Sequence, residues 1–535
     1  MAAIECGAFL VSNLNGRVAD QNHRDATPRS LRLGGVKAVN YDDWQTWQRQ
    51  GCTWLPAVAV DPDAELPASW EVFATEEAPF ALLESAQSGR YTYICSRAER
   101  LVWGEADGVR VFSRNGKGEP EVRRGLPLEL LRQLIGERRA PRLAGWPAMT
   151  GGFIGLFGYD LVQTWERLAR TAARDLRLPL FAAIEPRELF IYDHERRCLG
   201  VVVWSKLSSG SSLEEQFATA HATAKTALQK WVSLRKDGEA AGEAVRVDFG
   251  ERAGLVSSFS AEGFQAAARR IHDYIAAGDT YQVNLSRRTS RPTALSAERI
   301  YDALRRVNPS PYMGLFKLRE FALVCGSPEL LVKLEAGVIS SRPIAGTRPR
   351  GTFAADDSRF SAELLANEKE RAEHLMLVDL IRNDIGRVAE FGSVRVPEFM
   401  VLERYSHVMH IVSQVEGRLA AGRTWVDVFK SMFPGGTITG CPKIRTMEII
   451  EELEPVGRGF YTGSLGWISY AGEMELNIVI RSMLLQDGVA HVQAGAGVVA
   501  DSNPERELDE STRKAQALWV ALERAEAARE IPFPA

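Results

Sequence analysis

The spacing of apolar residues predicts a chain of mixed strands and helices. Apolar positions recur at helical spacing after Ser260, a residue suited to cap that helix, and Gly278 is suited to end it. Residues 367–384 form a second helical pattern, with the apolar positions toward one side. Residues 79–115 read as three strands, the last two joined by a turn at 106–108. Single strands are also predicted at 280–288, 461–470, 474–485 and 489–500.

The order of these elements predicts the fold class. Strands and helices mix without regular alternation, which indicates an α+β fold with large, mainly antiparallel sheets and flanking helices. The polar stretch 235–258 is rich in glycine and alanine, as linkers are. We therefore expect an N-terminal domain over 1–255 and a second domain over 256–535.

Composition narrows the class of protein. The chain has 535 residues, 45% hydrophobic and 25% charged, as in ordinary globular proteins. Its net charge of −4 argues against a general nucleic-acid or anionic-membrane surface. No apolar run approaches the ~18 residues of a membrane span, no signal peptide is evident, and the six cysteines form no CxxC pair. We expect a cytoplasmic protein with no membrane or nucleic-acid partner.

Two pairs of glutamates have a spacing that suits a metal site. Glu370 and Glu373 share one helix face, and Glu507 and Glu510 repeat the spacing near the C-terminus. Together they could hold Mg²⁺, which takes oxygen ligands and needs only one or two carboxylates. The alternative is a solvated surface with i,i+4 ion pairs from Lys369 to Glu373 and from Glu510 to Lys514. Spacing alone favours this alternative.

Three other motifs lack the residues that their chemistry requires. GGTITGCPK has Cys-Pro where a phosphate-binding loop needs Lys-Ser/Thr, and GAGVVA is followed by a proline-containing segment instead of a dinucleotide-binding helix. Both loops still offer backbone N–H groups to a carboxylate. His407 and His410 lie three apart, but in a strand they would face opposite ways, so at most one belongs to a site.

Eight motifs follow one another between 256 and 535: GDTYQVNLS, GSPELLV, RPIAGTRPRG, KERAEHLMLVDLIRND, YSHVMHIVS, FPGGTITGCPK, LNIVIRS and AGAGVVADSNPERELDESTRKA. In this order they resemble the chorismate-binding enzymes. These include the large subunits of aminodeoxychorismate synthase and anthranilate synthase, with the isochorismate and salicylate synthases as cousins. The resemblance is weaker over 1–255, where it rests on LLES, GRYTYI and GGFIGLFGYD.

The resemblance implies a Mg²⁺ site and a chorismate site. Glu373 and Glu510 would hold the cation, with Glu370 and Glu507 supporting it through water. The remaining implied residues contact or line the substrate: Tyr461, Arg481, Gly495 and Gly497 for the enolpyruvyl carboxylate, Lys514 near the ring carboxylate, Glu329 as general acid on the departing 4-hydroxyl, and Thr437 and His410 beside the ring.

Two positions bear on the reaction within the family. Water-using cousins carry a lysine base where this chain has Gln282, so an ammonia nucleophile is implied. Aminodeoxychorismate synthases often carry a lysine nucleophile where this chain has Ala345. The product implied is 4-amino-4-deoxychorismate, on the way to 4-aminobenzoate and folate, because the segments 281–286 and 435–443 look like those of aminodeoxychorismate synthase. Anthranilate plus pyruvate is the alternative product, and a non-catalytic chorismate- or tryptophan-binding module is a different class of reading.

Two partners are also implied. None of the six cysteines lies in the Gly-x-Cys-x-Gly loop of glutamine amidotransferases, so a separate amidotransferase subunit would supply the ammonia. A tryptophan pocket is implied by two segments, for which an ordinary strand and an ordinary turn are the alternative. Its expected residues are Leu83, Glu84, Ser85, Asn308, Pro309, Ser310, Pro311, Tyr312 and Met313.

Overall fold

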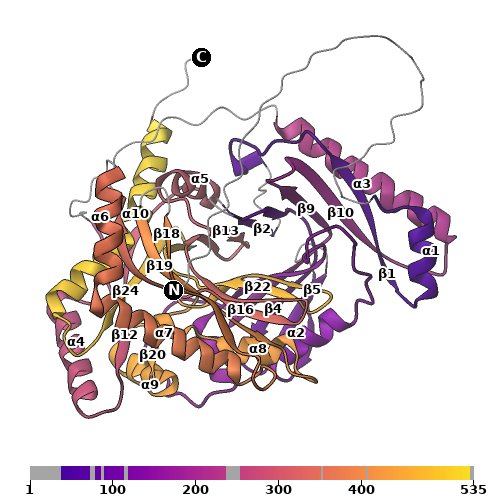
Figure 1. Ribbon diagram of the computed structural model, residues 1–535. Helices are drawn as coiled ribbons and strands as arrows, with labels where there is room; N and C mark the ends of the chain where they lie inside the picture. Colours follow the sequence, from indigo (N-terminus) through magenta and orange to yellow (C-terminus); the bar gives the residue numbers. More distant parts are fainter. Residues whose placement is uncertain are drawn as a thin grey trace, which may run out of the picture. The chain divides into compact units, whose positions relative to one another are not determined.

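The computed structural model describes residues 38–72, 79–85, 89–113, 118–235, 254–350, 354–404 and 408–530. All of them belong to one compact unit. Within these residues the chain forms two twelve-stranded sheets in which neighbouring strands run antiparallel. The predicted α+β fold with large antiparallel sheets is confirmed (Figure 1).

Sheet A contains strands from both ends of the described chain. Its spatial order is β1 (Trp54–Asp61), β10 (Cys198–Lys206), β9 (Glu188–Asp193), β3 (Tyr91–Cys95), β2 (Phe80–Glu84), β13 (Tyr312–Lys317), β14 (Ala322–Ser327), β23 (Ser482–Gln486), β24 (Val489–Val498), β12 (Gln282–Pro292) and β11 (Val256–Ser257), with β20 (Gly440–Cys441) also paired to β12.

Sheet B mixes early and late strands in the same way. Its order is β17 (Ile344–Pro349), β19 (Val408–Arg418), β16 (Val338–Ser341), β15 (Leu330–Glu335), β22 (Met474–Asn477), β21 (Ser464–Ser469), β7 (Gly152–Phe157), β8 (Phe181–Pro186), β4 (Ala98–Glu105), β5 (Gly108–Ser113) and β6 (Glu121–Arg124), with β18 (Arg395–Arg404) paired to β19. Both sheets thus contain strands from either side of residue 255. The domain boundary there stays a prediction, and residues 236–253 lie outside the described residues.

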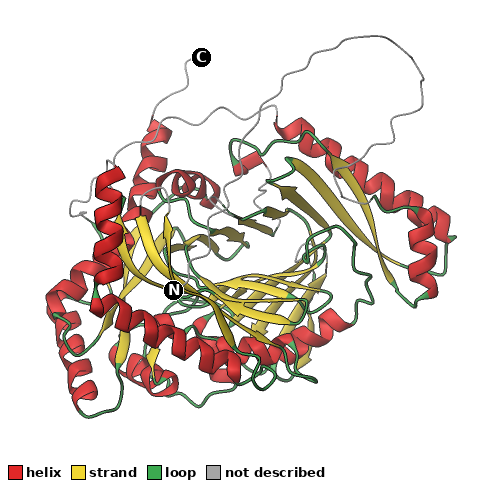
Figure 2. Cartoon of the chain, in the orientation of Figure 1, coloured by secondary structure: helices red, strands yellow, loops and turns green. Residues whose placement is uncertain are grey.

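The helices lie on the outer sides of the two sheets (Figure 2). One apolar core joins sheet A to sheet B, a second joins sheet A to α3, α5 and α10, and a third joins sheet B to α2, α7 and α8. No helix among the described residues is long and apolar enough to cross a membrane. The helices are α1 (Tyr41–Arg49), α2 (Pro127–Gly136), α3 (Leu213–Arg235), α4 (Ala261–Ala276), α5 (Ala297–Val307), α6 (Ala354–Ala366), α7 (Glu368–Gly386), α8 (Trp425–Met432), α9 (Lys443–Leu453) and α10 (Pro504–Glu530).

The start and end of α4 predicted from its capping residues are confirmed, and the structure adds a cap for α7. Ser260 accepts a hydrogen bond from the Gly263 N–H at the start of α4, and Gly278 follows its end with φ of +82°. Asn367 caps α7 in the same way through the Glu370 N–H. Local side-chain chemistry therefore fixes both helix starts.

Two strand predictions are wrong, for one shared reason. Residues 79–115 contain four strands instead of three, because the chain bends at Ser96–Arg97 and passes from sheet A to sheet B. Residues 474–485 form two strands instead of one, because β22 lies in sheet B and β23 in sheet A. Strands of both sheets bury their residues, so the apolar spacing on either side of a crossing looks alike, and periodicity alone does not reveal the change of sheet.

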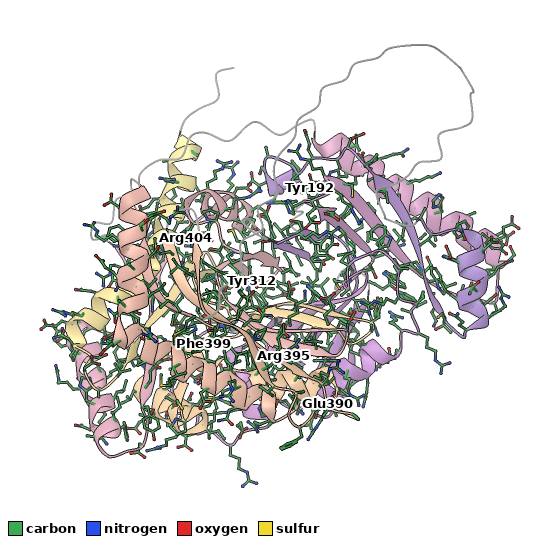
Figure 3. The ribbon with its side chains drawn as sticks, in the orientation of Figure 1. Tyr192, Tyr312, Glu390, Arg395, Phe399 and Arg404 are labelled. Atoms are coloured by element: carbon green, nitrogen blue, oxygen red, sulfur yellow. The ribbon has the colours of Figure 1, made fainter. Side chains whose placement is uncertain are left out.

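Strand β18 differs from the rest of sheet B in its exposure. It pairs only with β19, and the alternation of its side chains is interrupted by register shifts. Phe399, labelled with Arg395 in Figure 3, is 51% exposed. This strand forms an exposed margin of sheet B.

Candidate active site

The candidate site is built on two adjacent connections between the sheets. Residues 328–329 carry the chain from β14 to β15, and residues 478–481 carry it from β22 to β23. The Ile478 N–H donates to the Glu329 carbonyl at 3.0 Å, and the Gly326 N–H donates to the Arg481 carbonyl at 3.0 Å. These bonds hold Glu329 and Arg481, which lie 152 positions apart in sequence, on neighbouring crossings.

Glu329 lies in an environment that favours its neutral form. Its side chain is buried, and this burial raises the pKa of its carboxyl to about 7. Thr437, Lys514 and Arg481 act in the opposite direction and hold the pKa from rising further. The Thr437 hydroxyl is itself buried and has no close hydrogen-bond partner among the described residues, so it lies near the Glu329 carboxyl without a formed hydrogen bond. Glu329 can therefore carry a proton near neutral pH.

Arg481 presents a guanidinium to the same space. Burial lowers its pKa, and the nearby Glu329 acts against that effect. The residue is held at φ of +49°, a region uncommon for non-glycine residues. Among the described residues its side chain makes no ion pair. A planar fork of N–H donors in this condition suits a carboxylate ligand.

His410 is joined to the glutamate helix through one glycine. Its Nδ1 lies 3.2 Å from the Gly346 carbonyl, and burial lowers the pKa of the imidazole, which favours the neutral ring. A Cβ on Gly346 would lie 3.0 Å from Glu370 Oε2 and 2.8 Å from a Leu364 methyl, at φ of +63°. Only glycine therefore lets β17 pass between His410 and Glu370. His407 lies outside the described residues.

The four glutamates lie close enough to repel one another. Burial and then the charges of Glu370 and Glu510 raise the pKa of Glu373, and burial and the charge of Glu510 raise the pKa of Glu507. The structure therefore brings the α7 pair next to the α10 pair. In the part of the chain that the structure describes, no three acidic, histidine or cysteine side chains already converge on one point.

The alternative interpretation of these glutamates, a solvated surface with i,i+4 ion pairs, is met at one of the two expected pairs. Lys514 pairs with Glu510 at 2.8 Å, as expected of a surface ion pair, and its Nζ also donates to the Gly495 carbonyl at 3.1 Å. Lys369, however, pairs with Asp501 at 3.0 Å and not with Glu373. Burial is the main cause of the raised pKa values of Glu373 and Glu507, and the neighbouring carboxylates add to it. Buried oxygen donors that lie close to one another fit a hard divalent cation.

One wall of the site is made of amides lying on glycines. Gln282 and Asn284 point from β12 toward β24, where a Cβ on Gly497 would lie 2.5 Å from Gln282 Nε2 and a Cβ on Gly495 would lie 2.5 Å from Asn284 Oδ1. Asn284 Oδ1 is buried and has no hydrogen-bond partner among the described residues. Any larger residue at either glycine would displace an amide from this wall.

Tyr461 and Thr437 form a further wall. Thr437 lies in a short 3-10 turn at Gly436–Ile438, and Tyr461 packs its ring against the Arg458 guanidinium at 5.6 Å. Burial raises the pKa of the Tyr461 hydroxyl, which stays a neutral donor. Sequence reasoning missed Arg458, Asn284 and Gly346. The i,i+4 spacing of Glu454 and Arg458 was the available signal for the first.

The segments predicted to form a tryptophan pocket are adjacent strands elsewhere in sheet A. Leu83 pairs with Gly314 and Glu84 with Met313, and Tyr312 is labelled in Figure 3. Glu84 is buried and accepts hydrogen bonds from Tyr301 and Arg305, both at 2.8 Å. This carboxylate is already neutralised by an arginine.

The other residues predicted for the pocket lie around these strands. Ser310 donates to the Asn308 carbonyl just beyond α5, and Ser85 accepts from the Gly89 N–H. The two segments are thus brought together, and binding of tryptophan stays a prediction.

Comparison with known proteins gives consistent matches over most of the chain. The family model for chorismate binding enzyme matches residues 79–519. Aminodeoxychorismate synthase component 1 of Bacillus subtilis (strain 168) is 41% identical over 457 residues, which cover 85% of this chain and 94% of that protein. Anthranilate synthase component 1 of Thermus thermophilus is 44% identical over 472 residues, which cover 87% and 97%.

Solved structures agree in fold. Anthranilate synthase component I from Streptococcus pneumoniae TIGR4 superposes with a TM-score of 0.69 at 31% identity and covers 80% of this chain and 92% of that one. The menaquinone-specific isochorismate synthase of Escherichia coli has a TM-score of 0.62 at 19% identity and covers 90% and 98%, a likeness of fold alone.

Proposed function

Because the chain belongs to the chorismate-binding enzymes, we propose that it aminates chorismate with ammonia in a Mg²⁺-dependent reaction and forms 4-amino-4-deoxychorismate. At a coarser level it is a chorismate-utilising enzyme of the aminodeoxychorismate and anthranilate synthase type. In the overall reaction, one ammonia nitrogen enters the ring and the 4-hydroxyl leaves as water.

The glutamates of α7 and α10 would hold the cation. Glu373 and Glu510 would be direct ligands, with Glu370 and Glu507 acting through water. When bound, Mg²⁺ would neutralise the substrate's ring carboxylate and fix its orientation. The environment of these carboxylates supports the assignment, because burial raises the pKa values of Glu373 and Glu507 and the charges of the neighbouring glutamates add to that effect.

The substrate's second carboxylate would bind opposite the glutamates. Arg481 is the main candidate, since its guanidinium is buried beside Glu329 and makes no ion pair with the described residues. The Tyr461 hydroxyl and the N–H groups of Gly495 and Gly497 would complete this contact, and Lys514 would lie near the ring carboxylate.

Glu329 would supply the proton that turns the 4-hydroxyl into water. A general acid works best with a pKa near the working pH, and burial raises the pKa of Glu329 to about 7. His410, favoured as a neutral ring, and Thr437 would line the ring pocket without adding charge.

The main support for ammonia instead of water as the nucleophile is the glutamine at position 282. Its amide is buried on β12 and cannot deprotonate water, whereas water-using cousins carry a lysine at the position it resembles. Gln282 belongs to a wall formed with residues 435–443, and the sequences of both segments resemble those of aminodeoxychorismate synthase. In this wall Gln282 pairs with Cys441, and the Asn284 N–H donates to the Thr439 carbonyl at 2.8 Å.

Ala345 favours anthranilate as the second candidate product. It is buried on β17 next to Gly346, where many aminodeoxychorismate synthases carry a lysine nucleophile. Without that lysine, ammonia itself would attack C2 as the 4-hydroxyl leaves as water, and the 4-amino product would then need a second ammonia to add at C4 and displace the first from C2. If the reaction stops after the addition at C2 and pyruvate then leaves, the product is anthranilate.

Product analysis of the purified chain tests the proposal. Chorismate, Mg²⁺ and ammonium would be added, and anthranilate fluorescence and pyruvate would be followed with and without aminodeoxychorismate lyase. Formation of 4-aminobenzoate only with the lyase supports the proposal. Stoichiometric anthranilate and pyruvate without it would establish the second candidate, and no consumption of chorismate would leave the non-catalytic binding module. A glutamine amidotransferase subunit is the proposed physiological ammonia source.

A further inference from the structure

A buried ion pair lies behind the walls of the candidate site. Arg458 and Glu454 have side chains that are 1% and 2% exposed. Removing two charges from water costs several kcal/mol each unless their hydrogen bonds are satisfied. Here they are satisfied completely, since each of the five N–H donors of Arg458 has an acceptor.

The acceptors come from separate parts of the fold. Two of the donors meet Glu454 oxygens at the end of α9, at 2.7 and 3.0 Å. The others meet the Ile438 carbonyl at 2.9 Å, the Thr462 hydroxyl at 3.3 Å and the Asn284 carbonyl at 2.6 Å. One side chain therefore fixes a 3-10 turn, a tight loop and strand β12 relative to one another.

Glu454 extends this network to the neighbouring strands. Its Oε1 accepts from both the N–H and the hydroxyl of Ser286, each at 2.8 Å, and the Ser286 hydroxyl accepts from Gln493 Nε2 at 2.9 Å. Gln493 lies on β24 and Ser286 on β12, the two strands that carry the amide-on-glycine wall.

Each anchored group lies next to a residue proposed to contact substrate. Ile438 follows Thr437, Asn284 lies two residues from Gln282 on the same face of β12, and Gln493 lies two residues from Gly495. The Arg458 guanidinium also lies 5.1 Å from the centre of the Tyr159 ring and 5.6 Å from that of Tyr461. The second ring is itself part of the site.

We propose that Arg458, held by Glu454, is a positioning residue. It sets the placement of the wall that contains Gln282 and Gly495 relative to the wall that contains Thr437 and Tyr461. The inference rests on the proposed function, because those walls are defined by it. A buried ion pair is weak evidence for stability. The role proposed for this pair is to hold substrate-contacting groups in place, since a misplacement of such a group by about 1 Å can lower the rate ~100-fold.

Arg458→Lys tests the proposal because it keeps the charge and removes the planar fork. The matched control is Arg100→Lys, which changes an arginine that is also buried and paired with a buried glutamate, Glu185, and also bonded to a backbone carbonyl. Among the described residues, Arg100 bonds to Glu137, Glu185 and the Leu134 carbonyl, none of which belongs to the candidate site. Both variants should unfold at lower temperature than the wild type. Only Arg458→Lys should lower kcat/KM for chorismate, by about 100-fold and with a rise in KM.

Ser286→Ala is the second variant, for the case that Arg458→Lys does not fold. It removes one hydroxyl, whose hydrogen bonds reach Glu454 and Gln493 and none of the residues proposed to contact substrate, and it keeps the backbone pairing of Ser286 with Gly495. The variant should therefore fold and lower kcat/KM about tenfold through the loosened walls. Amide hydrogen exchange without substrate supplies a measurement independent of activity. Faster exchange at 282–286, 436–441 and 461–463 is expected in Arg458→Lys and Ser286→Ala but not in Arg100→Lys.

The outcomes separate positioning from stability. Equal losses of kcat/KM in Arg458→Lys and Arg100→Lys, or wild-type kcat/KM in Ser286→Ala, would overturn the proposal. If the wild type consumes no chorismate, the proposed function fails, and the exchange pattern alone then decides whether Arg458 fixes these segments. Unchanged exchange there would overturn the positioning role as well.

Discussion

Glu329→Gln should make the protein more stable while removing most of its activity. The substitution keeps the shape of the side chain and removes its ability to ionise. Moving the pKa of a carboxyl from 4.5 to about 7 disfavours the ionised form by about 3 kcal/mol in the folded state, at about 1.4 kcal/mol per pKa unit. This cost lowers the unfolding free energy of the wild type at pH values at which Glu329 is ionised in the unfolded chain.

The sign of the pH dependence follows from the raised pKa. Below the unfolded pKa, near 4.5, Glu329 is protonated in both states and costs nothing. As pH rises toward 7 the unfolded chain ionises first, so the wild type loses stability, and above about 7 the whole cost is present. The gain in unfolding free energy from Glu329→Gln should therefore grow by about 3 kcal/mol between about pH 4.5 and about pH 8.

Denaturant unfolding of wild type and variant at these two pH values measures the gain. Turnover with chorismate, Mg²⁺ and a fixed concentration of free ammonia should fall by ~100-fold or more, as expected for loss of a general acid. With free ammonia fixed, wild-type turnover should also decline above about pH 7, as Glu329 loses its proton. Glu335→Gln, at the other end of β15 with a side chain 41% exposed, is the control and should change neither quantity. A stability gain that is the same at both pH values, or near-normal turnover by Glu329→Gln, would refute the reasoning.

Three further outcomes are expected. Glu373→Gln or Glu510→Gln should abolish turnover at limiting Mg²⁺ without unfolding the chain, whereas the exposed Glu505→Gln on α10 should not; near-normal rates in either of the first two would remove them from the cation site. The purified chain should use ammonium but not glutamine, and glutamine-dependent turnover without a second subunit would contradict the proposed partner. Calorimetry should detect tryptophan binding that weakens in Glu84→Ala, and absence of heat with the wild type would count against that pocket.

The sequence predicted the fold class, and it gave candidate site residues without their arrangement in space. Ser260 caps within one helical turn, so local chemistry located α4, and apolar spacing located α7, whose cap Asn367 the structure adds. The glutamate spacing revealed each pair but not their approach, because α7 and α10 meet only through tertiary packing. Spacing alone favoured a surface ion-pair reading, and motif resemblance was needed to set it aside.

Other features had no local signal. The change of sheet after β22 is invisible to apolar periodicity, because strands buried in either sheet show the same pattern. The role of Gly346 depends on His410 and Glu370, which reach it from β19 and α7. Arg458 is bonded to Glu454 and Thr462, each four positions away, but its other two acceptors, the Ile438 and Asn284 carbonyls, lie in distant segments that no local pattern reveals.

The crossings that carry Glu329 and Arg481 have a consequence for how this architecture can change over evolutionary time. A residue inside a strand ladder is constrained by the partners on both sides, and replacing it disturbs register or packing. Residues 328–329 and 478–481 lie between ladders, so their side chains can be exchanged while every strand keeps its partners. The seam between the two sheets can therefore accept a change of side chain without any change in strand pairing.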